Sequence, residues 1–425
     1  MMTAPDTPLS LQAYRLATGL TQPFAKPLLE ARARRGKEDP GRLGERLGVA
    51  SRSRPAGPVV WLHAVSVGES MSLLPLVTAL AGERADLHLL VTSGTRASAQ
   101  LLAERLPAGA IHQFAPVDTP RAVARFLEHW RPDVGLFVES ELWPNLILGA
   151  RTRGVRLALV SARMTARSAR AWRGQPSAAR AVLNCFDLIL PQDMATAERL
   201  AALGGRVSER LNLKRLGEPL GCDPAELEKL RRAIGERPVV VAVSTHAPEE
   251  AFIAGAVAPL LPRPLTIFVP RHPERGAEIA RELAGYSLAR RALEEPIRPE
   301  TEVYLADTLG EVGLFLRLSQ VAIVGGGFAA EIGGHNPLEP ARLGVGVITG
   351  ASVANHADVY AEMFEAGAAL IAHDEAGLTA LLAGLTEDAG KRARMSEAAL
   401  AYAAAQQGRL ATALAQLRPL LPPAP

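Results

Sequence analysis

Glycines and polar side chains gather between residues 325 and 345, which read GGGFAAEIGGHNPLEPARLGV. The apolar run Val321–Val324 predicts a strand that leads into the first three glycines. Glycine at the carboxyl end of a strand lets backbone N–H groups approach a ligand closely, and a helix that starts just beyond favours a phosphate at its positive end. The pattern predicts a nucleotide or sugar-phosphate site, and the alternative is a tight turn of an α/β sheet. The candidate contacts are Gly325, Gly326, Gly327, Asn336 and Glu339.

A single carboxylate follows an earlier strand. The segment WLHAVSVGE (61–69) predicts a strand ending at His63, then a small-residue turn with Ser66 and Gly68, then a helix opened by Glu69. The helix dipole favours an ionised carboxylate at this position, and such a group can accept a proton as a general base. The alternative is that Glu69 only complements the partial positive charge of the helix N-terminus.

Two carboxylates flank Ser140 at the end of another predicted strand, in VESELWPN (138–145). Glu139 and Glu141 are costly neighbours unless hydrogen-bond donors surround them. The hydroxyls of a sugar supply such donors, and so does an arginine such as Arg163. Capping of the next helix by Glu139 or Ser140 is the alternative. We favour a role in a site.

Other predicted strands also end in polar turns. The candidates in them are Ser93, Gly94, Ser244, Thr245, Arg271 and His272. Ser93 and Gly94 can bind an anion or cap a helix, and Arg271 can meet a phosphate as a charged fork. Isolated histidines such as His246 and His272 are more often structural. However, four of the nine histidines (63, 246, 272 and 335) lie in turns of this kind, which favours a functional role.

These turns need a scaffold of buried strands. The strand candidates in the first half are Val59–His63, Leu87–Thr92, Ile111–Ala115, Val134–Val138, Leu157–Val160 and Leu188–Pro191. Those in the second half are Val239–Val243, Leu265–Val269, Val303–Ala306, Val321–Val324, Gly346–Ile348 and Ala369–Ala372. Most are continuously apolar, which is typical of parallel strands covered by helices on both faces. Two such series predict two doubly wound α/β domains whose strand ends face a shared cleft.

Composition limits the classes of function. The 425 residues are 48% hydrophobic and 21% charged, which is typical of a globular chain with a substantial core. Aromatic residues are only 4%, which argues against a protein that stacks single-stranded bases. Cys185 and Cys222 provide neither a disulfide framework nor a zinc set. No HExxH, CxxC, Walker A or GxSxG motif is present, so nothing visible requires a metal. The glycines do not fit GxGxxG, which disfavours a dehydrogenase.

The N-terminal stretch can be interpreted in two ways. Residues 9–31 are amphipathic, are interrupted by Pro23, and are followed by a basic cluster. The cluster consists of Arg32, Arg34, Arg35, Lys37, Arg42 and Arg46. The stretch is either a helix docked on the N-terminal domain or an interfacial anchor on an anionic membrane. No run reaches the ~18 apolar residues that a membrane span needs.

The ordered motifs resemble one family, the 3-deoxy-D-manno-octulosonate (Kdo) transferases of lipopolysaccharide synthesis, which are glycosyltransferases of GT-B fold. The motifs are GERLG (44–48), HAVSVGE (63–69), ESELWPN (139–145), SARMTARS (161–168), STHAPEE (244–250), PRHPER (270–275), DTLGE (307–311) and GGHNPLEPA (333–341). The resemblance covers nearly the whole chain. It departs from the family at Leu211, where a glycine is expected before Asn212-Leu213-Lys214, and in a less hydrophobic N-terminal helix.

The resemblance implies a reaction and a location. The donor would be CMP-Kdo, a substrate rather than a cofactor, and the acceptor would be the lipid A precursor (lipid IVA). The protein would sit on the cytoplasmic face of the bacterial inner membrane and bind no nucleic acid. Glu69 would be the catalytic base. The donor side would comprise Arg271, His272, Gly325, Gly326, Gly327, Asn336, Glu339, Ser244 and Thr245. The acceptor or sugar side would comprise Ser66, Gly68, Ser93, Gly94, Glu139, Glu141, Arg163 and Lys214.

The expected organisation has three parts. Residues 1–35 form the membrane-proximal segment, residues 36–216 the acceptor domain, and residues 217–425 the CMP-sugar domain with a C-terminal helix. Two other functions are weighed against Kdo transfer. One is a GT-B transferase that uses another nucleotide-activated acidic sugar, and the other is a non-catalytic paralogue that binds lipid or nucleotide.

Overall fold

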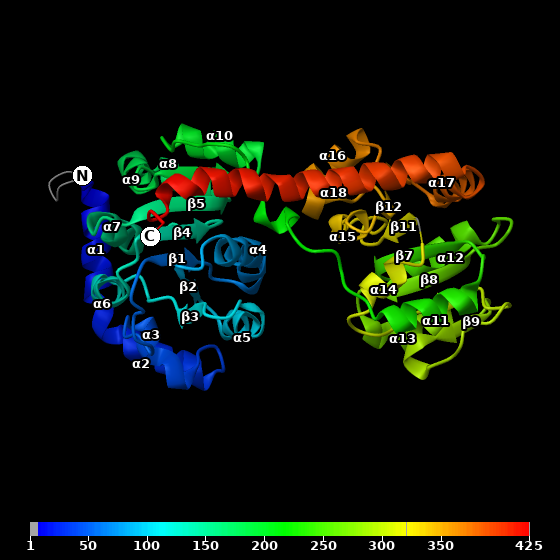
Figure 1. Ribbon diagram of the computed structural model, residues 1–425, viewed down its shortest axis with the longest axis horizontal. Helices are drawn as coiled ribbons and strands as arrows, with labels where there is room; N and C mark the ends of the chain where they lie inside the picture. The colour runs from blue at the N-terminus through cyan, green and yellow to red at the C-terminus, as the bar shows by residue number, and fades with distance from the viewer. Residues whose placement is uncertain (1–6, 320, 425) are drawn as a thin grey trace. The chain divides into compact units, whose positions relative to one another are not determined.

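The computed structural model describes residues 7–319 and 321–424, and these form two compact units (Figure 1). The first unit, here the N-terminal domain, comprises residues 1–217 together with 408–425. The second, here the C-terminal domain, comprises residues 218–407. The first six residues of the expected membrane-proximal segment lie outside the described residues.

The N-terminal domain contains a six-stranded parallel sheet of order β3-β2-β1-β4-β5-β6. Its strands are β1 (Val59–His63), β2 (His88–Ser93), β3 (Ile111–Phe114), β4 (Val134–Val138), β5 (Arg156–Ala162) and β6 (Leu188–Pro191). All six were predicted, with bounds that differ by at most two residues. This order is that of a doubly wound Rossmann-like sheet.

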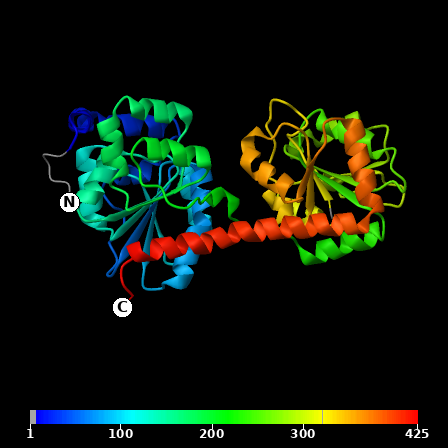
Figure 2. The ribbon, with the colours of Figure 1, turned by 90° about the horizontal axis from the view of Figure 1, so that it is seen from above.

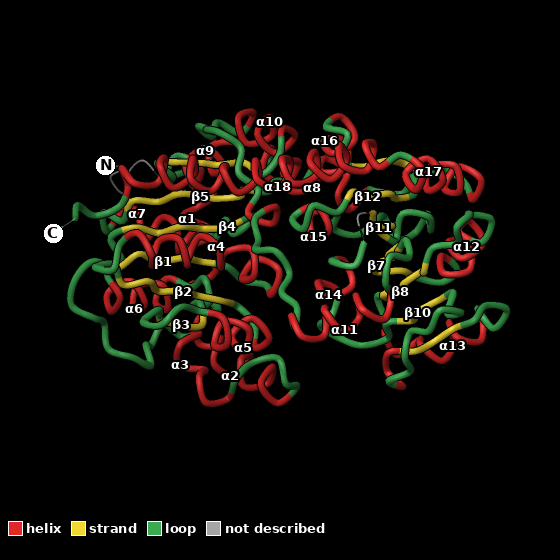
Figure 3. Tube along the Cα trace, turned by 45° about the vertical axis from the view of Figure 1, so that its right-hand side comes forward, coloured by secondary structure: helices red, strands yellow, loops and turns green. Residues whose placement is uncertain are grey.

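Helices cover both faces of this sheet, as Figure 3 shows. They are α1 (Leu9–Leu20), α2 (Gln22–Arg34), α3 (Leu43–Arg46), α4 (Val67–Glu83), α5 (Arg96–Arg105), α6 (Pro120–Trp130), α7 (Pro144–Thr152), α8 (Ala166–Arg173), α9 (Pro176–Leu183) and α10 (Met194–Ala202). Every residue of β1 is buried, because alternate side chains enter different cores. Trp61 packs with Phe126 and Trp130 on one face, whereas Leu62 packs with Leu73 of α4 on the other.

The C-terminal domain contains a seven-stranded parallel sheet of order β13-β12-β11-β7-β8-β10-β9. Its strands are β7 (Val239–Thr245), β8 (Leu265–Pro270), β9 (Leu288–Arg290), β10 (Val303–Leu305), β11 (Val321–Val324), β12 (Gly346–Thr349) and β13 (Ala369–Ile371). The prediction omitted β9, a three-residue edge strand in an arginine-rich segment without an apolar run. The other six strands were predicted. Figure 2 shows the strands side by side between two layers of helices.

The helices of the C-terminal domain are α11 (Pro224–Ile234), α12 (Glu249–Val257), α13 (Gly276–Glu282), α14 (Val312–Leu316), α15 (Leu338–Ala341), α16 (Ala357–Glu365) and α17 (Glu375–Glu387). The long helix α18 (Ala389–Leu417) begins in this domain. Its last turns and the following residues belong to the N-terminal domain. There Ala413, Leu414 and Leu417 are 3%, 5% and 0% exposed and pack with Val60 and Leu62. The prediction that the second domain contains all of residues 217–425 is therefore wrong for 408–425.

The first N-terminal helix, α1, is attached to the N-terminal domain along one side. Leu11 is buried against the core. The Tyr14 hydroxyl donates to Asp118 at 2.9 Å, and Asn145 donates to the Thr18 hydroxyl at 2.9 Å. The structure thus confirms that α1 docks on the N-terminal domain, through the side that carries Leu11, Tyr14 and Thr18. Within residues 7–319 and 321–424, no helix is long and apolar enough to cross a bilayer.

Candidate functional site

The predicted acidic residues of the N-terminal domain follow two neighbouring strands. Strands β1 and β4 pair directly at the position where the strand order reverses. In open α/β sheets, ligands bind beyond the carboxyl ends of the strands at such a switch point. Glu69 follows β1, and Glu139 and Glu141 follow β4. The fold therefore brings together carboxylates that are 70 residues apart in the sequence.

Glu69 is the third residue of α4 and takes part in a capping box with Ser66. Its Oε2 accepts hydrogen bonds from the Val65 N–H at 2.7 Å and the Ser66 N–H at 3.3 Å. The Ser66 hydroxyl in turn accepts from the Glu69 N–H. Glu69 therefore has a structural role at the helix N-terminus, as the alternative interpretation expected, but this role occupies only one of its carboxylate oxygens. Oε1 accepts no hydrogen bond from any residue that the structure describes, so it can accept a proton from a ligand.

Glu139 is buried and forms an ion pair with Lys214, with Oε1 and Nζ 2.6 Å apart. The sequence suggested Arg163 as the cation for this pair of acids. Instead, the Arg163 side chain is exposed, and its backbone carbonyl accepts from the Ser140 hydroxyl. Leu211 is buried and lies outside the left-handed region of backbone space, so its place before the Asn-Leu-Lys triplet causes no strain there. Lys214 accordingly reaches the acidic cluster.

Glu141, unlike Glu139, has no lysine or arginine partner among the described residues. Burial raises its pKa to about 7, and the nearby charges of Glu69 and Glu139 act in the same direction. The indole N–H of Trp143 donates to Oε2 at 2.5 Å and opposes the shift. The Nε2 of His63 lies 3.9 Å from the same oxygen. Glu141 thus changes protonation near neutral pH.

A buried network sets the orientation of His63. Trp61 Nε1–H, which can only donate, is 2.8 Å from the Thr92 hydroxyl oxygen, and His63 Nδ1 is 2.9 Å from it. The alternative acceptor for the Thr92 hydroxyl, the Leu62 carbonyl, is farther away at 3.4 Å. The Thr92 hydroxyl therefore donates to His63 Nδ1, the nearer of the two acceptors. This bond favours the His63 tautomer with its proton on Nε2, the nitrogen that faces Glu141. Burial lowers the pKa of His63 to about 3, so the ring is neutral. Sequence reasoning counted His63 among the histidines favoured for a functional role but gave it no specific role, and it did not select Trp143, although both lie in quoted motifs.

The remaining predicted residues of this domain differ in what surrounds them. A Cβ on Gly94 would lie 2.6 Å from Val65 Cγ1, so packing explains this glycine. The Ser93 hydroxyl is buried against His112 Nε2 at 2.9 Å. A Cβ on Gly68 would meet no atom within 4 Å. The fold therefore gives no steric reason for glycine at position 68, next to Glu69.

In the C-terminal domain, the predicted donor residues follow β11, β7 and β8, which are adjacent in the sheet. The switch point lies between β11 and β7. A Cβ on Gly325 would lie 2.5 Å from the Ser244 carbonyl oxygen, and a Cβ on Gly327 would lie 2.3 Å from Thr349 Oγ1. Gly326 has a φ of +74°. The tight-turn interpretation therefore explains all three glycines.

Glu249, a buried residue that the sequence did not single out, holds this turn. Its carboxylate accepts from the N–H groups of Gly326 at 2.8 Å, His246 at 3.0 Å and Phe328 at 3.1 Å. Thr245 donates its hydroxyl to the buried Glu250 at 2.9 Å. The N–H of Gly326 and the hydroxyl of Thr245, both predicted to contact a ligand, are thus bonded within the protein. The sequence signal that could have identified this role is the acidic pair Glu249–Glu250 at the start of α12.

The polar residues around the turn are more open. Arg271 is exposed, and its guanidinium makes no hydrogen bond or ion pair with the described residues. Asn336 Nδ2 lies 3.5 Å from Glu339 Oε1. Burial raises the pKa of Glu339. The expected helix after the turn is only α15, a single turn, so its dipole contributes little to phosphate binding. His272 is half exposed and pairs with Glu274.

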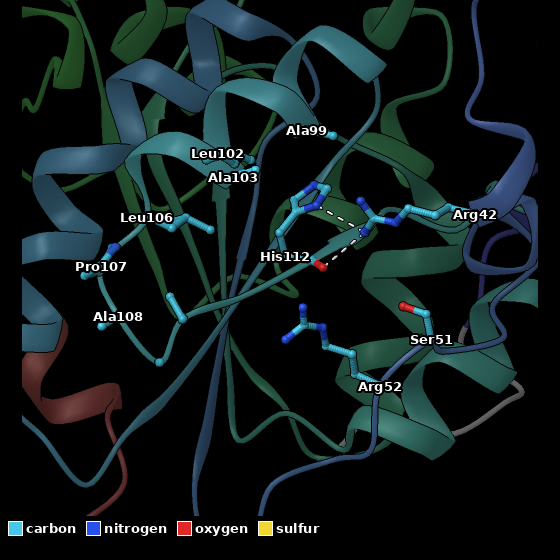
Figure 4. Close-up of a pocket in the computed structure, with 12 residues that line it drawn as sticks. Arg42, Ser51, Arg52, Ala99, Leu102, Ala103, Leu106, Pro107, Ala108 and His112 are labelled. Carbon is cyan, nitrogen blue, oxygen red and sulfur yellow. Dashed lines mark hydrogen bonds between the residues drawn. The ribbon is translucent and has the colours of Figure 1, made fainter.

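A separate cavity of about 600 Å³ lies in the N-terminal domain beside β3 and α5 (Figure 4). Arg42 and His112 meet in its wall, where Arg42 Nη2 is 3.2 Å from His112 Nδ1. Arg42 also forms a bidentate ion pair with the buried Glu45. None of the predicted site residues lines this cavity. Across the described ranges, no cluster of histidine, cysteine and acidic side chains is suited to a metal ion.

Two Rossmann-like domains, each with polar residues at the switch point of its sheet, define the class of GT-B-fold proteins. A glycosyltransferase from Rickettsia africae shares the fold, with a TM-score of 0.57, 12% identity, and coverage of 86% of this chain and 99% of that one.

Sequence relatives define the family. Residues 41–215 match the model of 3-deoxy-D-manno-octulosonic-acid transferase (kdotransferase). The 3-deoxy-D-manno-octulosonic acid transferase of Bordetella pertussis is 38% identical over 394 residues, 87% of this chain and 88% of the relative. A probable mitochondrial enzyme of the same name from Arabidopsis thaliana is 35% identical over 376 residues, 84% of each chain. The chain belongs to the Kdo transferase family and is a glycosyltransferase, as the motifs indicated.

Proposed function

We propose that the protein transfers Kdo from CMP-Kdo to the lipid A precursor, with CMP as the leaving group and no cofactor or metal. The observation that carries this proposal is the geometry of Glu69, whose Oε2 is fixed by two backbone N–H groups while Oε1 is left for a substrate. The membership of the Kdo transferase family supports the choice of sugar. Transfer of another nucleotide-activated acidic sugar is the alternative within the same fold.

The chemistry assigned to Glu69 is general-base catalysis. Oε1 takes the proton from the primary hydroxyl of the acceptor while that oxygen forms a bond to the anomeric carbon of Kdo. The bond between this carbon and the phosphate oxygen breaks through an oxocarbenium-like transition state, and its electron pair stays on the phosphate. One displacement inverts the configuration at the anomeric carbon. Lys214 and Glu139 form an ion pair in the same acidic cluster as Glu69 and Glu141.

The donor nucleotide is assigned to the C-terminal domain. Arg271 offers an uncommitted guanidinium for the phosphate, whose charge grows as the bond breaks. Of Gly325, Gly326 and Gly327, only Gly327 has an N–H without an acceptor among the described residues, because Gly325 donates to Val243 and Gly326 to Glu249. Asn336 and Glu339 are the candidate contacts for the nucleoside hydroxyls.

We also propose that the protein binds the cytoplasmic face of the inner membrane through α1 and α2. Leu9, Leu16, Leu20, Phe24 and Leu28 are 82%, 67%, 69%, 70% and 62% exposed and form the apolar strip of these helices. A basic cluster follows at residues 32–46, and its exposed members Arg34, Arg35 and Lys37 suit anionic lipid. Its other members, Arg32, Arg42 and Arg46, form ion pairs with the buried Glu38 and Glu45. Docking of α1 on the domain and membrane binding therefore use different sides of the same helices.

The test is to incubate the purified chain with CMP-Kdo and lipid IVA and to identify the product by mass spectrometry. We expect one or more Kdo additions and release of CMP. Glu69→Gln should retain CMP binding and lose transfer by about 10²–10⁴-fold, the usual contribution of a general base. Full transfer by Glu69→Gln would disprove the assigned base, and turnover of UDP-sugars in preference to CMP-Kdo would favour the alternative donor.

A further inference from the structure

Two histidines of the C-terminal domain meet directly at the switch point of its sheet. His246 follows β7 and His335 follows the glycine turn after β11, and their Nε2 atoms are 2.7 Å apart. The ring planes differ by 6° and the ring centroids are 5.0 Å apart. Because the centroids are so much farther apart than the nitrogens, the rings meet end to end through Nε2. This is the in-line geometry of an N–H···N hydrogen bond.

Such a pair has one proton between two nitrogens in the neutral state. One imidazole donates its Nε2–H, and the other accepts through the Nε2 lone pair. A second proton would make both nitrogens donors and break the contact. The pair therefore has two distinct states, joined and neutral or opened and protonated, and the second state presents an N–H group to a ligand.

The groups around the pair are mainly basic. Arg271, His272, Arg275 and His356 act on the two rings and lower the pKa of one or both, in addition to the larger effect of burial. Together these effects lower the pKa of His335 to about 4. Tyr360 donates its hydroxyl to the His335 carbonyl and not to the ring.

The acids nearest to the pair are bonded elsewhere. Glu250 raises the pKa of His246, but it forms an ion pair with Arg275 at 2.9 Å. Glu249 accepts three backbone N–H groups, including that of His246. The pair thus lies neutral beside the guanidinium of Arg271, and a bound anion would favour its protonated state.

We propose that the His246–His335 pair binds the phosphate of the nucleotide and takes up one proton from solvent when a phosphate dianion binds. The position supports this assignment: His335 packs on the glycine turn, where a Cβ on Gly326 would lie 2.9 Å from its Cδ2. The inference rests on the proposed function, which assigns CMP to this domain.

The proton uptake matters for the transfer step. CMP-Kdo carries one negative charge on its phosphate diester, whereas released CMP is a monoester that reaches two. When the bond from the anomeric carbon to the phosphate oxygen breaks, the electron pair stays on that oxygen. The opened pair then donates N–H to the more highly charged group, and it binds CMP more tightly than it binds the donor.

Calorimetric titration of the full chain with CMP at pH 7.5 tests this directly. The phosphate of CMP has a second pKa near 6, so at pH 7.5 it is already largely a dianion and any proton taken up goes to the protein. Titrations in two buffers of different ionisation enthalpy give the number of protons bound. We expect uptake of up to one proton, a Kd that tightens up to about tenfold per pH unit from pH 8 to 7, and no uptake with cytidine.

The variants His335→Gln and His246→Gln should each abolish the uptake and flatten the pH dependence of Kd. His373→Gln, an exposed histidine of the same domain, should behave as wild type. CMP binding by the wild type without proton uptake would overturn this inference and leave the proposed donor intact. A wild-type protein that does not bind CMP would instead overturn the proposed donor. If a glutamine variant fails to bind CMP, the proton uptake measured with the wild-type protein still tests the inference.

Discussion

Gly68 and Gly327 are glycines for different physical reasons, which a pair of variants can separate. Gly327→Ala would place a Cβ 2.3 Å from Thr349 Oγ1 and 2.7 Å from the Gly350 nitrogen. We expect a loss of about 1–3 kcal/mol in the free energy of unfolding from this overpacking. Gly68→Ala meets no atom and lies in the first turn of α4, so its stability should stay within about 1 kcal/mol of wild type.

The transfer activity of Gly68→Ala should fall even though its stability does not. If substrate approaches the backbone beside Glu69, Gly68→Ala lowers kcat/KM at least tenfold without a lower Tm. Thermal denaturation and the mass-spectrometric transfer assay measure the two properties on the same samples. Wild-type activity in Gly68→Ala would show that no ligand comes close to this residue.

Glu141 predicts a pH-dependent stability. Its pKa is raised from 4.5 to about 7 in the folded state, mainly by burial. The folded state therefore binds more protons than the unfolded state between these values, and its stability falls as pH rises through this range. Glu141→Gln removes this effect, so the variant should gain up to about 3 kcal/mol relative to wild type between pH 4 and pH 8.

Chemical denaturation at several pH values measures this difference for Glu141. Glu104→Gln, at an exposed position on α5, is the control and should show no trend relative to wild type. A pH-independent difference between Glu141→Gln and wild type would mean that Glu141 titrates normally.

At the level of single residues, the sequence predicted the location of the sites better than their internal bonding. Glu69, Glu139 and Glu141 were found because each follows an apolar strand. Their bonding depends on contacts that are distant in sequence, such as that of Lys214 with Glu139, 75 residues away. Glu249 was missed because a carboxylate that binds backbone N–H groups cannot be distinguished in sequence from any acid in a first helical turn.

At the level of elements, the last turns of α18 are the part that prediction assigned to the wrong domain. Helical periodicity predicts the helix, but it does not indicate which core receives each turn. Strand β9 was missed for a related reason, since three residues at a sheet edge need no apolar run. Most of the twelve predicted strands are buried on both faces, and this produces the continuous apolar signal.

The assignment of α18 can be tested with intrinsic fluorescence. All four tryptophans, at positions 61, 130, 143 and 172, lie in the N-terminal domain, so their emission reports on that domain alone. Leu417→Ala removes a fully buried side chain and should destabilise the fluorescence-detected transition by about 2–5 kcal/mol. Leu400→Ala, on the same helix but 48% exposed, should shift it little. Equal transitions in the two variants would contradict the assignment.

At the level of the whole molecule, membrane binding can be separated from folding because the apolar strip is exposed. The triple variant Leu16→Ser, Leu20→Ser, Phe24→Ser leaves the buried Leu11 and the Tyr14–Asp118 bond in place. We expect at least tenfold weaker binding to anionic liposomes in a sedimentation assay, because each side chain contributes about 1.5–3 kcal/mol when buried in lipid. Binding should also weaken with added salt.

A matched control is Leu309→Ser, which changes a leucine that is 84% exposed in the C-terminal domain. This variant should bind liposomes like wild type. Unchanged binding by the triple variant would exclude the strip as the membrane contact and would leave the basic cluster as the remaining candidate.

The return of residues 408–425 to the first domain has a consequence for synthesis on the ribosome. The N-terminal domain is begun first but is completed last, because all of residues 218–407 are translated between its two parts. At about 5–20 residues per second, this interval lasts roughly 10–40 s. During it, the apolar surface that later receives Leu414 and Leu417 has no covering segment. The nascent chain therefore offers a binding surface to chaperones that the finished protein lacks.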